Sequence, residues 1–164
     1  MKNINTFKDF INEDKPFLES RESAGLAIIW DGMVLLGHSA NRKKFASYGI
    51  SKGGIEEGES HLEAAIRETR EEFGIKVPKS LIGKDEHTFT VTSRKYKYNK
   101  VVYYYIVEVK ELSQIGLKDI VVPKRQLQTE EVDYAAFMKR DEALKYAMVS
   151  QFGVLQNLTN KGLI

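Results

Sequence analysis

The chain contains no cysteine and only three histidines. Without cysteine it cannot form disulfide bonds, a thiol nucleophile or a cysteine zinc site, and this composition is typical of proteins in a reducing compartment. His38, His61 and His87 do not have the spacing of paired zinc ligands. We therefore interpret all three histidines as structural or peripheral.

The chain also lacks an apolar run long enough to cross a bilayer. The run VVYYYIV at residues 101–107 is far shorter than the roughly 20 apolar residues of a transmembrane helix. The first residues, MKNINTFKDFINEDKPF, contain no unbroken apolar stretch typical of secretory signals. The chain has 25 lysines and arginines and 23 acidic residues, so its net charge does not indicate a particular class of partner. We expect a cytoplasmic protein that does not bind membranes, and the oligomeric state is left open.

A chain of 164 residues is long enough for one domain with a proper core. We expect residues 21–164 to form this domain and residues 1–20 to be an N-terminal extension. Within the extension, Phe7, Phe10 and Ile11 predict a short amphipathic helix that ends before Pro16.

The hydrophobic pattern predicts a hairpin, because residues 25–30 and 33–39 are rich in strand formers and flank Asp31-Gly32. A polar loop is expected at 41–44, and a short strand at 45–50 that runs into Ser51-Lys52-Gly53-Gly54. Further strands are predicted at 86–92, at 101–109, within 112–127 and at 132–138. Helices are predicted from an Asp141 cap through Leu144 to Met148, and at 149–158.

The segment from Gly53 to Ile75, GGIEEGESHLEAAIRETREEFGI, predicts a helix with defined ends. Ser60 and Glu63 have the spacing of a capping box, and Gly74 suits the left-handed position that closes a helix. One stripe of this helix recurs at helical spacing and is expected to face the core: Leu62, Ile66, Thr69 and Phe73.

Three acids, Glu68, Glu71 and Glu72, share another face of this helix, with the small Ala64 one turn earlier. Like charges at this spacing repel by about 0.2–0.5 kcal/mol per pair, and the helix dipole disfavours acids in the last turn by about 0.3–1 kcal/mol each. A divalent cation would remove this repulsion. The alternative is a solvated acidic face on the helix surface. The adjacent Arg67, and the glycines Gly53 and Gly74 at the two ends of the segment, favour a metal site instead.

These residues resemble the Nudix box of the Nudix hydrolases. The match comprises Gly53, five residues, Glu59, seven residues, and then Arg67-Glu68-Thr69-Arg70-Glu71-Glu72-Phe73-Gly74-Ile75. The departure within the box is Thr69, where the family usually has an aliphatic residue. The resemblance implies an α/β fold, a Nudix α/β/α sandwich around a mixed β-sheet.

The resemblance also implies hydrolysis of a pyrophosphate bond with Mg²⁺ or Mn²⁺. The metal ligands would be Glu68, Glu71 and Glu72, together with the carbonyl of Gly53, and Arg67 would orient carboxylates such as Glu59. A late glutamate often serves as an extra ligand or general base in the family. The candidate is Glu130 or Glu131, and the competing interpretation is an exposed loop acid.

The segment before the box departs from the family at two positions. Nudix proteins commonly have Trp-x-x-Pro-Lys-Gly here, whereas this chain has Tyr48 in place of the tryptophan and Ser51 in place of the proline. Tyr48 and Lys52 are candidates for substrate binding, with Lys52 on a phosphate. The Lys-Gly form resembles the branch of the family that acts on dinucleoside polyphosphates.

The substrate is expected to be a small nucleotide, and ADP-ribose, a dinucleoside polyphosphate and a nucleoside triphosphate all stay open. The proline associated with ADP-ribose pyrophosphatases is absent from 79–122, and Tyr96 and Tyr98 come late for the tyrosine of dinucleoside-tetraphosphate hydrolases. A basic, aromatic hairpin tip at 93–100, with Lys95, Lys97 and Lys100, raises the alternative of a nucleic-acid partner, an RNA 5′ end. A non-catalytic nucleotide-binding module is the other alternative, and the complete set of acids argues against it.

Overall fold

The computed structural model describes residues 19–41, 47–93 and 98–164. The predicted helix around Phe7, Phe10 and Ile11 lies outside these residues, as do most of the predicted 41–44 loop and the lysines Lys95 and Lys97. No helix in the described ranges is long and apolar enough to cross a membrane.

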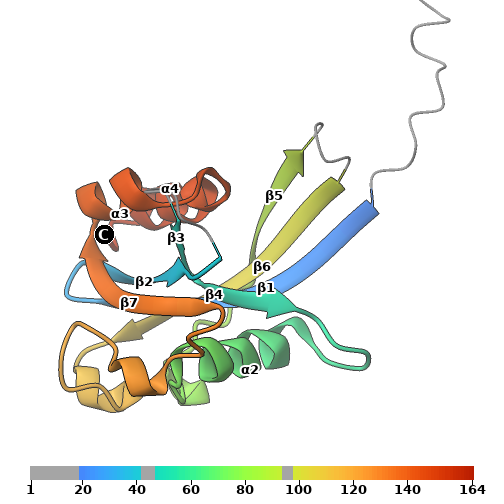
Figure 1. Cartoon of the computed structure of the whole chain (residues 1–164). Coiled ribbons are helices and arrows are strands. Elements are labelled where there is room, and N and C mark those ends of the chain that lie inside the picture. Colours follow the sequence, from blue (N-terminus) through green and yellow to red (C-terminus); the bar gives the residue numbers. More distant parts are fainter. Residues whose placement is uncertain (1–18, 42–46, 94–97) are drawn as a thin grey trace, which may run out of the picture.

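A mixed sheet forms the middle layer, and helices cover both of its faces (Figure 1). The strands are β1 (Glu19–Trp30), β2 (Met33–Ser39), β3 (Tyr48–Gly49), β4 (Ser51–Gly54), β5 (His87–Ser93), β6 (Tyr98–Val109) and β7 (Val132–Lys139). Their order is β3-β2-β1-β6-β5, with β4 paired to β1 and β7 paired to β2. Only β1 and β6 are parallel, and all the other named pairs are antiparallel.

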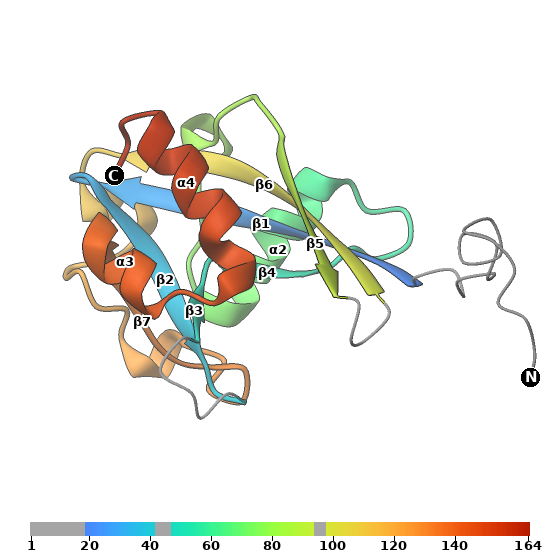
Figure 2. The ribbon, with the colours of Figure 1, turned by 90° about the horizontal axis from the view of Figure 1, so that it is seen from above.

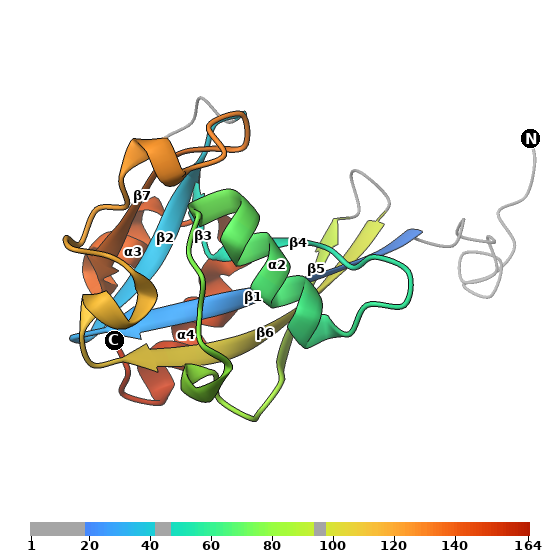
Figure 3. The same ribbon diagram turned by 90° about the horizontal axis from the view of Figure 1, so that it is seen from below.

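Helices α3 (Arg140–Tyr146) and α4 (Phe152–Asn160) lie on one face of the sheet (Figure 2). Helix α2 (His61–Phe73) crosses the other face over β1, β4 and β6 (Figure 3). The described residues also contain four short 3₁₀ helices: η1 (Lys79–Leu81), η2 (Leu112–Ile115), η3 (Lys124–Gln126) and η4 (Val149–Gln151). The predicted α/β/α sandwich is confirmed.

Strand β1 supplies both hydrophobic cores because successive side chains of a strand point to opposite faces. Leu26 and Ile28 pack into the core under α2, whereas Ala27 and Ile29 pack into the core under α4. The predicted hairpin is confirmed: Trp30 pairs with Met33. Asp31 and Gly32 have φ values of 48° and 70°, the positive values that a two-residue type I′ turn requires.

Several predicted elements need correction. Strands β1 and β6 begin earlier than predicted, at Glu19 and Tyr98, because they pair with each other along their whole length. The predicted strand within 112–127 is wrong: this segment forms η2 and η3, and at residues 120–122 it pairs with β7 through an isolated bridge between Val121 and Ala136.

The glycine-containing segment 51–54 is itself a strand, β4, because it finds a partner in residues 23–26 of β1. Asp141 does not cap α3, because the N-cap position falls on Lys139, which makes no capping side-chain hydrogen bond. Helix α3 ends at Tyr146, short of the predicted Met148. The predicted C-terminal helix is present, and it starts with the 3₁₀ turn η4 before α4.

Candidate active site

Helix α2 has the ends that the sequence predicts. The backbone N–H of Glu63 donates to the Ser60 hydroxyl over 3.2 Å, and the Ser60 N–H donates to the Glu63 carboxylate over 2.9 Å. Gly74 follows with φ at 65°, and its N–H donates to the carbonyl of Arg70. These caps fix where the helix starts and stops, and so they fix which turn carries the acids.

The core face of α2 differs in part from the prediction. Thr69 and Phe73 are buried as expected, but Leu62 and Ile66 are only partly buried at the edge of the core. Ala64, which was expected beside the acids, is completely buried. The small alanine side chains of α2 let its backbone lie close to β1 and β4, which brings the acidic face next to β4.

Two of the three departures from the Nudix pattern, Ser51 and Thr69, contact each other. The hydroxyls of Ser51 on β4 and Thr69 on α2 lie 2.7 Å apart, and both residues are completely buried. Thr69 also hydrogen-bonds the carbonyl of Ala65 over 2.9 Å. A serine and a threonine therefore form a polar link between β4 and α2 where the family pattern has a proline and an aliphatic residue.

Arg67 is the centre of an ion-pair network. Its Nε donates to Glu59 over 2.8 Å, and its Nη1 donates to Glu68 over 2.7 Å and to Glu71 over 3.2 Å. Its Nη2 donates to the carbonyl of Gly54 over 2.8 Å. The guanidinium thus ties three of the candidate acids to β4, an arrangement suited to orienting carboxylates.

Glu68 packs directly against the backbone of Gly53. A Cβ atom added at Gly53 would lie 2.1 Å from the Glu68 carboxyl carbon, so any side chain at this position would displace the Glu68 carboxyl. Burial raises the pKa of the Glu68 carboxyl, and the negative charge of Glu71 acts in the same direction, although Arg67 opposes them.

Glu72 is the most enclosed of the acids. The backbone N–H of Lys52 donates to its carboxylate over 3.1 Å. Burial raises the pKa of Glu72 to about 8, the positive charge of Lys52 lowers it, and the nearby charges of Glu68 and Glu131 raise it further. The ionised form of this carboxyl therefore lacks sufficient compensating charge, which is the condition that a bound cation would correct.

A pocket of about 310 Å³, here called the acidic pocket, opens beside these residues. It is lined by Lys52 and Glu72, by Glu131 from the loop before β7, and by Gly37 and Gly49 of the neighbouring strands. Glu130 is exposed and is not part of this lining. Of the two late acids, Glu131 is therefore the one that lies at the site.

The donor set fits a hard divalent cation in its chemistry, because every candidate ligand is a carboxylate or carbonyl oxygen. Across residues 19–41, 47–93 and 98–164, however, no three acids or histidines already converge as a metal cage. Glu68 and Glu71 contact Arg67, whereas Glu72 turns to Lys52.

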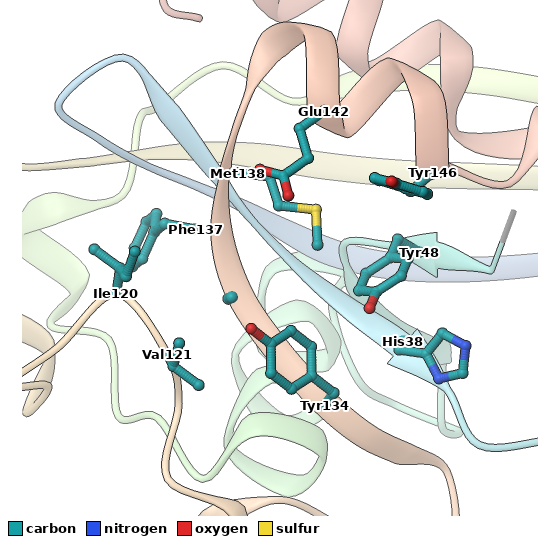
Figure 4. Close-up of a pocket in the computed structure, with 10 residues that line it drawn as sticks. His38, Tyr48, Ile120, Val121, Tyr134, Phe137, Met138, Glu142 and Tyr146 are labelled. Carbon is teal, nitrogen blue, oxygen red and sulfur yellow. The ribbon is translucent and has the colours of Figure 1, made fainter. Parts of the chain in front are cut away.

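Tyr48 lies apart from Lys52. It lines a second cavity of about 530 Å³, here called the aromatic pocket, on the sheet face that carries α3 (Figure 4). The neighbouring His38 ring lies 5.0 Å from the Tyr48 ring, and its Nδ1 is 2.6 Å from a carboxylate oxygen of Asp133. Sequence reasoning paired Tyr48 with Lys52, but the structure places them in different pockets.

The other two histidines lie away from the acids. His61 stacks on Tyr103 with ring centroids 3.7 Å apart and hydrogen-bonds Glu86 over 3.0 Å. His87 lies on β5 beside the ring of Tyr104. These positions agree with peripheral roles.

Gln151 holds the backbone of Ile50, which lines the acidic pocket, and the sequence did not reveal this contact. Its buried side-chain oxygen accepts a hydrogen bond from the Ile50 N–H over 3.2 Å, between β3 and β4. No local pattern points to it, because its partner lies about a hundred residues earlier in the chain.

Solved structures share this fold. An Ap4A hydrolase from C. elegans, in a binary complex, matches with 22% identity, a TM-score of 0.63, and coverage of 87% of this chain and 97% of that one. The NUDIX domain of Shewanella oneidensis NrtR complexed with ADP ribose matches with 16% identity, a TM-score of 0.64, and coverage of 96% and 99%.

A third structure is a bifunctional NMN adenylyltransferase/ADP ribose pyrophosphatase from Francisella tularensis, complexed with AMP and a Mn ion. It matches with 13% identity, a TM-score of 0.65, and coverage of 89% of this chain and 43% of that one. Comparison with curated proteins gives no match. At these sequence identities the structural matches establish a shared fold, and they do not establish a shared substrate.

The family follows from the sequence itself. The family model described as NUDIX domain matches residues 20–158, which is most of the chain and includes α2 and its acids. The chain therefore belongs to the Nudix family of hydrolases, which are typically pyrophosphohydrolases and typically use divalent metal ions.

Proposed function

We propose that this protein hydrolyses a pyrophosphate bond in a nucleoside diphosphate linked to another group, with Mg²⁺ or Mn²⁺ as cofactor. The observation that carries the proposal is the pairing of the enclosed carboxylate of Glu72 with Lys52 at the acidic pocket, which Glu131 also lines. A pocket that holds both negative and positive side chains suits a metal ion and a phosphate chain together.

Each residue then has a defined task. Glu68, Glu71, Glu72 and the carbonyl of Gly53 hold the metal, which when bound offsets phosphate charge and lowers the pKa of a coordinated water. Lys52 contacts a phosphate from the floor of the acidic pocket.

Arg67 and two further acids, Glu59 and Glu131, complete the arrangement. Arg67 keeps the carboxylates of Glu59 and Glu68 in place through its hydrogen bonds. Glu131 faces the same pocket from the opposite loop, and there it accepts the proton of the attacking water.

Similar proteins support a nucleotide as the substrate. The Shewanella domain holds ADP ribose, and the Francisella enzyme holds AMP with Mn. ADP-ribose, a dinucleoside polyphosphate and a nucleoside triphosphate are the candidates for this chain. The alternative of an RNA 5′ end rests mainly on Lys95 and Lys97, which lie outside the described residues, and so it stays a prediction.

A release assay tests the proposal. The purified chain is incubated with the candidate nucleotides, and with a triphosphorylated RNA, in magnesium or in excess chelator. We expect nucleoside monophosphate to be released from at least one nucleotide only when the metal is present. Metal-dependent nucleotide binding without release from any candidate would instead indicate the non-catalytic module.

A further inference from the structure

The proposed reaction assigns no task to the aromatic pocket. It combines three tyrosines from distant parts of the chain, Tyr48 on β3, Tyr134 on β7 and Tyr146 on α3 (Figure 4). The ring of Tyr48 lies 6.4 Å from that of Tyr134 and 6.3 Å from that of Tyr146, centroid to centroid. The volume of about 530 Å³ is within the usual range of about 300–1,000 Å³ for small-ligand sites.

Both the surface and the geometry of this pocket suit a planar ring. Tyr134 is 42% exposed, although the four strand residues after it, 135–138, are buried. The Tyr48 and Tyr134 rings meet edge to face, at an interplanar angle of 84°. A flat ligand that stacks on one of these rings therefore presents its edge to the other, an arrangement that aromatic groups favour.

One charged side chain gives the pocket a preference among ligands. Glu142 extends from α3 into the space above β7 (Figure 4). An ionised carboxylate only accepts hydrogen bonds, so it favours a ring that carries N–H donors. Adenine, guanine and cytosine have an exocyclic amino group that donates to a carboxylate. Uracil has no amino group, and its single ring N3–H donor lies between two carbonyl oxygens that a carboxylate repels.

The aromatic pocket and the acidic pocket are neighbours. His38 of β2 pairs with Tyr48 of β3, and both line the aromatic pocket. The next pair along these strands is Gly37 with Gly49, and both line the acidic pocket. The N–H of Met148, which lines the acidic pocket, donates to the carbonyl of Tyr48, which lines the aromatic pocket, over 2.9 Å. The two pockets therefore meet at this edge of the sheet, and a single nucleotide can span them.

We propose that the aromatic pocket binds the nucleobase of the substrate, a base with an exocyclic amino group, while its phosphates occupy the acidic pocket. This inference rests on the proposed function, since it assigns a second part of the same substrate. Stacking on tyrosine supplies affinity, and Glu142 supplies the choice of base.

Equilibrium dialysis with magnesium tests the assignment without any turnover. The probes are AMP, UMP and the base-free ribose 5-phosphate. Base stacking on one aromatic ring contributes about fivefold to a hundredfold in affinity. We therefore expect AMP to bind more tightly than ribose 5-phosphate by a factor in this range, and Tyr134→Ala to reduce that factor towards one.

Three further variants sharpen the test. Tyr134→Phe keeps a ring and should keep the preference for AMP over ribose 5-phosphate. Phe152→Ala is the matched control, because Phe152 is also 42% exposed but lies outside the aromatic pocket. Glu142→Gln should reduce the preference for AMP over UMP, and because Glu142 is exposed this variant gives a second readout that does not depend on packing.

Equal binding of AMP and ribose 5-phosphate by the unaltered protein would overturn the assignment. So would the same loss of AMP binding in Phe152→Ala as in Tyr134→Ala. If the protein hydrolyses a nucleotide but fails this binding test, only the assignment of the base site is refuted. If the protein passes the binding test but hydrolyses nothing in the release assay, only the proposed reaction is refuted.

Discussion

At the scale of single residues, Glu72 is the acid whose surroundings suit a charge least without a cation. Its carboxyl is largely enclosed, has the Lys52 N–H as a donor, and has a pKa raised by burial to about 8. Glu71, by contrast, is exposed and contacts Arg67. The three acids of the motif thus occupy different environments. Their shared face on the predicted helix does not indicate this difference.

Glu72→Gln keeps the size of the side chain but removes a charged ligand. If Glu72 holds the metal that stabilises charge in the transition state, turnover should fall at least about a hundredfold. Steady-state assays on the nucleotide found by the release assay provide the measurement. Glu108→Gln, on the exposed side of β6, is the control. Unchanged turnover in Glu72→Gln would remove Glu72 from the metal site.

The buried contact between Ser51 and Thr69 can be measured by a double-mutant cycle. Ser51→Ala and Thr69→Val should each destabilise the protein, by about 1–3 kcal/mol where a buried hydroxyl loses its partner. The double variant should cost less than the sum of the two, because it leaves neither hydroxyl behind. Urea unfolding gives all four free energies. Additivity within about 0.5 kcal/mol would mean that the two hydroxyls are independent.

At the scale of elements, β4 and α2 form the site together. β4 provides Lys52 and Gly53, and α2 provides the acids that lie against them. The contact at Gly53 is so close that a side chain on the strand at this position would displace the Glu68 carboxyl. The sequence shows both segments but does not show that residues 51–54 are held as a strand by β1.

Adjacent glycines on β4 provide a matched test of this contact. Gly53→Ala places a methyl group into the Glu68 carboxyl, whereas a methyl group at Gly54 meets nothing within 4 Å. We expect Gly53→Ala to lower turnover about a hundredfold, the scale of a misplaced catalytic group, and Gly54→Ala to have a much smaller effect. Equal turnover in the two variants would show that the position of Glu68 is not set by Gly53.

The start of α2 is tied to β6 through Glu86. The Tyr105 hydroxyl donates to the Glu86 carboxylate over 2.5 Å, and His61 hydrogen-bonds the same carboxylate. The hydrogen bond from Tyr105 is the main cause that lowers the pKa of Glu86, and His61 adds to it.

This pKa shift predicts a pH-dependent contribution to stability. Because the folded pKa lies below the ordinary value of 4.5, the folded state binds fewer protons than the unfolded state between the two values. The stabilisation is thus complete above pH 4.5 and is lost as the pH falls through the folded pKa. Tyr105→Phe should destabilise the protein at neutral pH, and the difference should shrink in acid.

Tyr104→Phe is the control for this pH series. Tyr104 accepts a hydrogen bond from the uncharged Asn157. The destabilisation caused by losing this hydrogen bond should therefore not vary with pH over the same range. Denaturant unfolding from pH 3 to pH 7 separates the two cases. A constant cost for Tyr105→Phe would argue against a charged Glu86 as its partner.

At the scale of the whole molecule, the metal should act on the stability of the entire chain. A ligand that binds only the folded state stabilises it by about 2.7 kcal/mol at a hundred times its Kd. For a chain of this length that corresponds to a rise of about 5–10 °C in Tm. Thermal melting with and without magnesium measures the effect. Glu72→Gln should reduce it, and an equal rise in both proteins would point to a metal site elsewhere.

The sequence by itself determined the parts of this protein that depend on neighbours in the chain. The ends of α2 follow from Ser60, Glu63 and Gly74, because capping joins residues only a few positions apart. The β1–β2 turn follows from Asp31-Gly32 for the same reason. The order of the acids on one helix likewise needs nothing beyond helical periodicity, and together these features led to the family and its sandwich fold.

Tertiary structure decided everything that joins distant segments. It made a strand of residues 51–54 through β1, and it reduced the predicted strand within 112–127 to a bridge between Val121 and Ala136 on the edge of β7 that β2 leaves open. It also brought Tyr48, Tyr134 and Tyr146 around one cavity and placed Gln151 against Ile50. These contacts depend on which strand lies beside which, and pairing across about a hundred residues leaves no periodic signal in the chain.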